Sequence, residues 1–132
     1  MEVKASLQSY RQSPRKVRLI ATAIRGKRVP DALTELDFMI KRGAAPMKKL
    51  LMSAIANAEN NFKLDRTTLI IKNITVNAGV TMKRSMPRAF GRAYPIHKRT
   101  SHINLTLDEG KELGALSPKS KVRAQSAKFK MK

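Results

Sequence analysis

Residues 66–107 have the sequence RTTLIIKNITVNAGVTMKRSMPRAFGRAYPIHKRTSHINLTL and contain no Asp or Glu. Both ends of this stretch alternate apolar with polar residues and are rich in β-branched side chains, which is typical of strands. Two prolines and Gly91 lie between the ends and favour a turn near residues 86–93. We therefore expect a β-arm at about residues 76–103, whose strands each span on the order of 40 Å at about 3.3 Å per residue.

The charge of the chain is strongly positive. Its 28 Lys and Arg outnumber its 9 Asp and Glu, which gives a formal net charge of +19 over 132 residues. This is far more than the roughly 2 to 8 charges that keep a small domain soluble. Like charges at such density repel one another in a compact fold, whereas phosphates that displace condensed counterions convert the same charges into affinity. The composition therefore predicts a nucleic-acid partner.

The positive charges are concentrated in three parts of the chain. Residues 29–65 hold five acids and five bases and are neutral, but residues 1–28 hold eight bases and one acid. Residues 117–132 hold six bases and no acid, and the β-arm is the third basic part. We expect these three parts to face the partner, while the neutral middle builds the core.

Several classes of function find no support in the sequence. The chain has no cysteine, so disulfides and thiolate metal sites are excluded. No apolar run approaches the roughly 20 residues of a membrane span, and a secretory signal pattern is absent. His97 and His102 have no further ligands nearby, and we find no cofactor fingerprint and no pair of nucleophile and base. We expect an intracellular binding protein without metal or cofactor, not an enzyme.

The N-terminal part predicts a strand followed by a basic helix. Residues 3–7 alternate apolar with polar side chains, which indicates a half-buried strand. Ser13 and Pro14 predict a helix that begins with a cap from the Ser13 side chain and ends at Gly26. The apolar stripe of this helix consists of Val17, Ile20, Ala21 and Ile24. Its opposite face carries Arg15, Arg18 and Arg25, and we predict that this face contacts phosphate.

The neutral middle predicts two more helices. The first begins at Pro30 and ends at Gly43. Its apolar face consists of Leu33, Leu36, Met39 and Ile40. The second follows Pro46 and keeps apolar residues at helical spacing as far as Ala58, so we expect it to be the main core helix.

Two strands frame the β-arm. The first runs from Thr68 to Val80 with Lys72 out of phase or beside a bulge, and the second returns over residues 103–107. Four bases of the arm have no neighbouring carboxylate, and guanidinium groups fit phosphate in bidentate geometry. These bases are Lys83, Arg84, Arg88 and Arg92.

The apolar side chains of the arm leave two possibilities open. They lie in a segment too polar to form its own core, so they are either exposed or stacked on bases. We favour stacking, because irregular or single-stranded RNA displays base faces that a duplex hides. These side chains are Met82, Met86, Phe90 and Tyr94.

Several motifs resemble one family. Residues 13–20 (SPRKVRLI), 24–27 (IRGK) and 53–61 (SAIANAENN) resemble the bacterial-type large-subunit ribosomal protein twenty-two. The segments MKR from Met82, PRA from Pro87, GRA from Gly91 and KRTSHI from Lys98 resemble the hairpin of the same family. The match covers residues 3–107 in order.

The resemblance implies a fold and a place in the ribosome. The implied fold is α+β, with three helices packed on a small three-stranded antiparallel sheet and a long protruding β-hairpin. The implied partners are large-subunit rRNA near the exit of the peptide tunnel, neighbouring ribosomal proteins, and the nascent polypeptide at the hairpin tip. No membrane and no obligate homo-oligomer are implied, and the ribosome is cytoplasmic, with an organellar one left open. The tunnel-lining residues would be Lys83, Arg84, Arg88, Ala89, Phe90, Gly91 and Arg92.

The motifs and charges together define the expected organisation. Residues 1–110 form a single RNA-binding domain that includes the arm, and residues 111–132 form a basic extension that is disordered without its partner. The expected RNA-binding residues of the N-terminal part are Arg11, Ser13, Arg15, Lys16, Arg18, Arg25 and Lys27. Those of the arm are Met82, Lys83, Arg84, Met86, Pro87, Arg88, Arg92, Lys98, Arg99, Thr100, Ser101 and His102.

Two other functions compete with this interpretation. A DNA-bending architectural protein also uses basic β-arms with a proline near the tip, although such proteins usually supply a helical dimer core. An enzyme acting on RNA would need a carboxylate or nucleophile whose replacement removes turnover without reducing binding, and the sequence offers no candidate.

Overall fold

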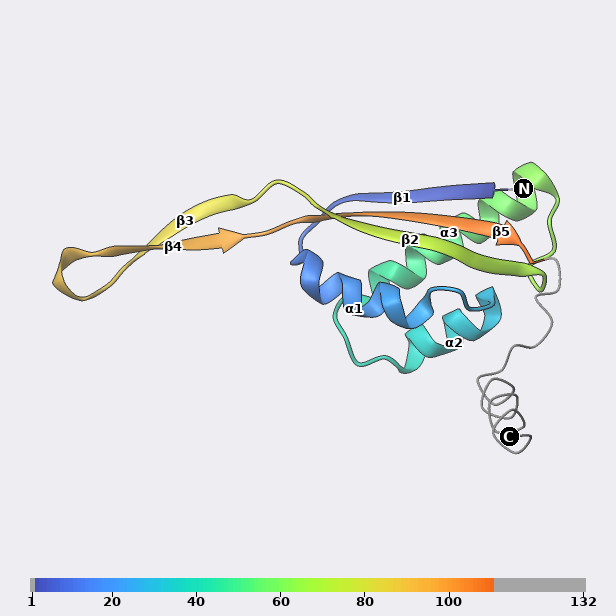
Figure 1. Cartoon of the computed structure of the whole chain (residues 1–132), viewed down its shortest axis with the longest axis horizontal. Helices are drawn as coiled ribbons and strands as arrows, with labels where there is room; N and C mark the ends of the chain where they lie inside the picture. The colour runs from blue at the N-terminus through green and yellow to red at the C-terminus, as the bar shows by residue number, and fades with distance from the viewer. Residues whose placement is uncertain (1, 111–132) are drawn as a thin grey trace, which may run out of the picture.

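The fold consists of a sheet covered by helices on one face and a hairpin that projects from it (Figure 1). The computed structural model describes residues 2–110. In this part of the chain, β1 (Glu2–Tyr10), β5 (Ser101–Glu109) and β2 (Leu69–Ala78) form an antiparallel sheet in the order β1-β5-β2. The helices are α1 (Pro14–Ile24), α2 (Val29–Phe38) and α3 (Ala44–Phe62). The predicted α+β fold class is confirmed, while the predicted basic extension at 111–132 lies outside the described residues.

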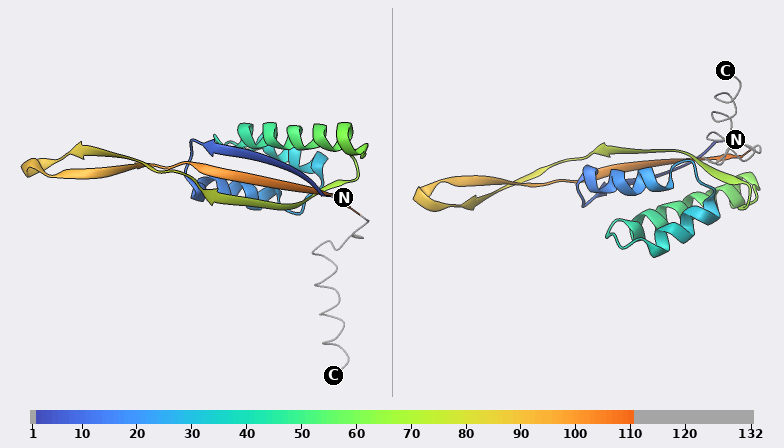
Figure 2. Two further views of the ribbon diagram at one scale, coloured as in Figure 1. Left: turned by 90° about the horizontal axis from the view of Figure 1, so that it is seen from above. Right: turned by 60° about the horizontal axis from the view of Figure 1, so that its bottom comes forward.

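The hairpin is a separate two-stranded sheet. β3 (Met82–Pro87) pairs with β4 (Ala93–Lys98), and the pair extends away from the body in every view (Figures 1 and 2). Val76 and Ile103, which lie at the base of the predicted arm, are buried in the core instead. The free part of the arm therefore begins beyond them.

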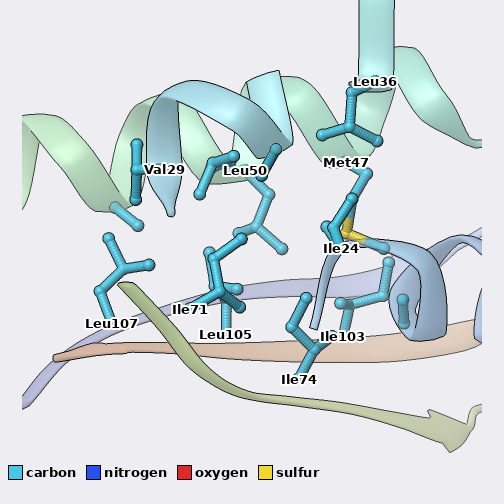
Figure 3. Packing of buried hydrophobic residues seen from close by; sticks show 14 of the residues in the cluster. Ile24, Val29, Leu36, Met47, Leu50, Ile71, Ile74, Ile103, Leu105 and Leu107 are labelled. Atoms are coloured by element: carbon cyan, nitrogen blue, oxygen red, sulfur yellow. The ribbon is translucent and has the colours of Figure 1, made fainter. Parts of the chain in front are cut away.

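The core lies between the sheet and the helices (Figure 3). Leu105 and Leu107 of the central strand β5 are almost fully buried, Leu105 below Leu50 of α3 and Leu107 below Val29 of α2. The predicted stripe of α1, from Val17 to Ile24, is buried and confirmed. Burying each large apolar side chain contributes roughly 1.5 to 3 kcal/mol, so this layer holds the body together without help from the hairpin.

Two helix ends differ from the predictions. Ser13 is the N-cap residue of α1, but its side chain makes no capping hydrogen bond, and its backbone carbonyl accepts from the Lys16 and Val17 N–H groups instead. α2 ends at Phe38 and not at Gly43, because the backbone of Met39 is already extended. The prediction that Ile40 joins the core is therefore wrong, since its side chain is 97% exposed.

The predicted irregularity at Lys72 is confirmed and holds an ion pair cluster. The register of β2 against β5 shifts between Ile71 and Asn73, which is the mark of a bulge. The Lys72 ammonium lies 2.6 Å from Glu2 Oε1 and 2.9 Å from Asp108 Oδ2, so it joins all three strands. The hydrogen bond from Lys72 lowers the pKa of both carboxyl groups below their ordinary values.

This cluster predicts a modest acid sensitivity that depends on Lys72. Because the folded-state pKa values of Glu2 and Asp108 are lowered, their stabilising contribution is complete above about pH 5 and is lost as the pH falls through the lowered values. The K72Q variant should therefore unfold at a lower temperature than the wild type at pH 6, and this gap should narrow as the pH falls below about 4 and the two carboxyl groups become protonated. Circular dichroism recorded during heating measures the unfolding temperatures of the wild type and the variant at each pH. K49Q has the same loss of charge and serves as the control, and a gap that stays constant with pH would contradict the prediction.

Candidate nucleic-acid interface

The hairpin exposes both of its faces. Its strands pair along their whole length, from Met82 opposite Lys98 to Pro87 opposite Ala93. Every residue of β3 and β4 is exposed, so the backbone ladder holds the hairpin and no apolar core supports it. Its side chains are therefore available to a surrounding partner on all sides.

The bases of the hairpin have no acidic partners. The ion pairs found within residues 2–110 involve Lys27, Lys48 and Lys72, and none lies on the hairpin. Arg84 donates to the neighbouring Lys83 carbonyl at 2.7 Å, and the Arg88 guanidinium lies 5.9 Å from the centre of the Tyr94 ring. These contacts use few of the available donors, so the hairpin remains cationic and can bind anions.

The tip presents an aromatic ring to its surroundings. The loop is closed by a hydrogen bond from the Arg88 N–H to the Arg92 carbonyl at 2.8 Å, which agrees with the predicted turn. Phe90 and Gly91 both have positive φ, at 59° and 68°. This conformation suits glycine but costs a side-chain-bearing residue roughly 1 kcal/mol or more. Phe90 adopts it with its side chain 100% exposed.

A short neck joins the hairpin to the body, and we use this name for residues 79–81 and 99–100. The Gly79 N–H donates to the Thr100 carbonyl at 2.9 Å, and the Thr100 hydroxyl donates to the Val80 carbonyl at 2.7 Å. Thr100 is 8% exposed and the neighbouring Ser101 is fully buried. Thr100 and Ser101 were expected to contact RNA, but their burial makes them part of the neck and the sheet in this structure.

A basic depression of about 530 Å³ lies beside the neck, and we call it the neck pocket. Three parts of the chain that are far apart in the sequence build it: the connection from β1 to α1 together with the first turn of α1, the connection from α2 to α3, and the end of β4 together with Arg99. Its lining residues are Arg11, Gln12, Ser13, Lys16, Arg42, His97, Lys98 and Arg99. The lining includes five Lys and Arg side chains but no carboxylate, so an anion would be attracted to it.

Arg42 and His97 are residues of the neck pocket that the sequence analysis missed. Arg42 belongs to the middle segment, which is neutral when charges are counted along the chain. The Tyr10 hydroxyl donates to the Arg42 carbonyl at 3.5 Å, so the loop after α2 lies close to the end of β1. No local pattern in the sequence signals this approach.

The basic surface continues from the neck pocket along α1. A second depression is lined by Ser13, Pro14, Arg15, Arg18, Ala78 and Arg99, and it shares Ser13 and Arg99 with the neck pocket. Arg11 supports this arrangement, because its guanidinium donates to the Arg99 carbonyl at 3.3 Å. The predicted phosphate-binding residues at the start of α1 and at the end of β4 are therefore brought together.

Arg18 and Arg25 also stabilise the edge of the sheet. Arg18 Nε donates to the Val76 carbonyl at 3.1 Å, and an Arg25 Nη donates to the Ile74 carbonyl at 2.5 Å. Ile71 exchanges backbone hydrogen bonds of 2.9 and 3.0 Å with Gly26 and Lys27, so the segment after α1 also pairs with this edge. Each guanidinium keeps further N–H groups for a phosphate. Lys27, in contrast, is paired with Glu35, so its charge is already compensated.

Two other features are absent from the same part of the chain. Among residues 2–110, no three His, Asp or Glu side chains gather as a metal would require. No helix in that range combines the length and the apolar character needed to cross a membrane.

Known proteins resemble this chain over most of its length. A family model described as ribosomal protein L22p/L17e matches residues 5–108. The large ribosomal subunit protein uL22 of Desulfitobacterium hafniense is 50% identical over 111 residues, which cover 84% of this chain and 97% of that protein. The protein of the same name from Mesoplasma florum is 53% identical over 109 residues, with 83% and 97% covered. That from Lawsonia intracellularis is 51% identical over 112 residues, with 85% and 100% covered.

Proposed function

The chain belongs to the family of ribosomal protein L22p/L17e, and from this premise we propose that its neck pocket and hairpin bind the RNA of the large ribosomal subunit. As a member of this family it is a structural constituent of the large subunit of the cytoplasmic ribosome and not an enzyme. Association with rRNA and with neighbouring ribosomal proteins follows from that membership. What we propose is which residues of this chain contact the RNA.

One observation carries the proposal: a basic surface without acids runs from the body onto the hairpin. Its bases come from the neck pocket, the first turns of α1 and the hairpin. Phosphate oxygens would satisfy the free guanidinium and ammonium donors, and the release of counterions would supply much of the affinity. The residues of this proposed interface on the body and the neck are Arg11, Ser13, Arg15, Lys16, Arg18, Arg25, Arg42 and Arg99. Those on the hairpin are Met82, Lys83, Arg84, Met86, Pro87, Arg88, Arg92, His97 and Lys98.

The hairpin tip has a second proposed role, which is to line the path of the nascent peptide. The exposed Phe90 and the bases around it lie at the far end of the hairpin, where a passing chain could contact them. The residues proposed to line the tunnel are Lys83, Arg84, Arg88, Ala89, Phe90, Gly91 and Arg92. Crosslinking from a photoreactive group at Phe90 to a stalled nascent peptide in ribosomes would test this role.

Binding to RNA should be strong, dependent on salt and selective over DNA. We expect the full chain to bind a large-subunit rRNA fragment more tightly than a kinked DNA duplex of equal length. The logarithm of the affinity should fall linearly with the logarithm of salt concentration, because each phosphate contact contributes about 0.7 to 0.9 to the slope. Filter binding over a range of salt concentrations measures both quantities. Preference for the kinked duplex, together with a homodimer at micromolar concentration, would favour the DNA-bending alternative.

A further inference from the structure

Strand β1 contains a bulge near its C-terminal end, opposite His102 of β5. Leu7 pairs with Ile103 and Tyr10 pairs with Ser101, so two residues of β1 lie opposite His102 alone. Ser9 takes a positive φ of 54° at this place. A bulge takes a backbone N–H out of the ladder, and here the His102 ring replaces the lost partner, since Ser9 N–H donates to His102 Nδ1 at 3.0 Å.

The other side of the same ring lies against the neck. A methyl group placed on Gly79 would lie 2.9 Å from His102 Nε2 and 2.5 Å from the Thr100 hydroxyl oxygen. The absence of a side chain at Gly79 is therefore what lets these two groups approach the strand. Because Nδ1 accepts a hydrogen bond, the neutral ring carries its proton on Nε2. The His102 ring thus lies between the bulge of β1 and Gly79 of the neck.

We propose that His102, Thr100 and Gly79 form a latch that fixes the direction of the hairpin in the free protein. The hairpin has no buried residue of its own, so within residues 2–110 its direction is set at its base, where the neck joins it to the body. Turning the hairpin about the neck would break the Gly79 to Thr100 hydrogen bond and the Thr100 to Val80 hydrogen bond. The His102 ring supports both from the side, because it lies between Ser9 and Gly79. In this proposal His102 is a positioning residue.

The latch would help the hairpin to bind RNA, and this consequence rests on the proposed RNA-binding function. A hairpin that already points in one direction loses less conformational freedom when RNA surrounds it, which is how preorganisation raises affinity. The latch itself exists without RNA. It can therefore be tested in the free chain.

Spin-label distances test the latch directly. The chain has no cysteine, so S53C on α3 and S85C on β3, both at exposed positions, would carry the only two labels. Double electron–electron resonance on the free full-length chain gives the distribution of distances between body and hairpin. We expect a narrow distribution in the wild type. In H102L and in T100V it should broaden about twofold, because the hairpin then takes up a wider range of directions relative to the body.

Conservative variants distinguish loss of the latch from a general loss of folding. H102N should keep the narrow distribution, because the Asn side-chain oxygen can accept from Ser9 N–H at the place of Nδ1, and T100S keeps the hydroxyl. Thermal unfolding of each variant identifies any that is not folded. A wild-type distribution as broad as that of H102L, or an H102L distribution as narrow as the wild type, would overturn the proposal. Because no RNA is present, neither result bears on the RNA-binding function, which the filter-binding experiment tests separately.

Discussion

Replacement of Lys16, Arg42 and Lys98 by Gln in one variant should weaken binding to large-subunit rRNA about 100-fold. These side chains come from three separate segments, and all line the neck pocket. Each charge-assisted contact to phosphate contributes on the order of 1 kcal/mol, so the loss of three corresponds to about two powers of ten in affinity. The magnitude of the salt slope should fall by about 2 to 3. Filter binding at several salt concentrations measures both changes.

A variant with the same loss of charge elsewhere is the control. Lys4, Lys63 and Arg66 are exposed and lie toward the end of the sheet away from the neck. Their replacement by Gln lowers the net charge equally but leaves the neck pocket intact, so affinity should fall much less. Equal losses in the two variants would mean that net charge alone drives binding, and the neck pocket would then not be a site.

The fold was predictable where the sequence pattern is local. The alternation of apolar residues in β2 and β5 and the stripe of α1 depend on neighbours a few positions apart. The stripe of α1, the apolar residues of β5 and those of β2 as far as Val76 face the core as expected, whereas Ala78 and Val80 at the end of the predicted strand are exposed. The acid-free stretch with its central turn predicted the hairpin, because its bases have no carboxylate within the segment to pair with. The bulge at Lys72 was also visible as a break in the alternation.

The candidate site was less predictable because its contacts join distant residues. Arg18 and Val76 are 58 positions apart, and no local pattern indicates that a guanidinium of α1 stabilises the edge of β2. Arg42 entered the neck pocket only because α2 ends early and its following loop approaches β1. His102 looked like one more polar residue of a basic motif, but the structure uses its ring to satisfy a bulge in another strand. Charge counted along the sequence therefore indicates which segments are basic without identifying which bases lie together in the fold.

Removal of the hairpin should leave the body folded but lower rRNA affinity about 1000-fold. Met82 and Lys98 form the first pair of the hairpin, so an Asn-Gly turn can replace residues 83–97 without moving the neck. The shortened chain loses four bases, Lys83, Arg84, Arg88 and Arg92, which corresponds to about 4 kcal/mol of phosphate contacts. Its thermal unfolding midpoint should match that of the full chain, because every removed residue is exposed. Circular dichroism and filter binding measure the two effects.

A full-length variant separates the effect of the hairpin's charge on RNA affinity from the effect of its length. Replacement of the same four bases by Gln keeps the strands and the exposed Phe90 while removing the positive charge. If phosphate contacts carry the affinity, this variant should lose as much binding as the shortened chain, whereas stacking by Phe90 and Tyr94 would preserve part of it. An unfolded body after removal of the hairpin would contradict the independence of the two parts. Unchanged affinity of the shortened chain would mean that α1 and the neck pocket without His97 suffice to bind the RNA, because the bases of the hairpin beyond Lys98 are removed.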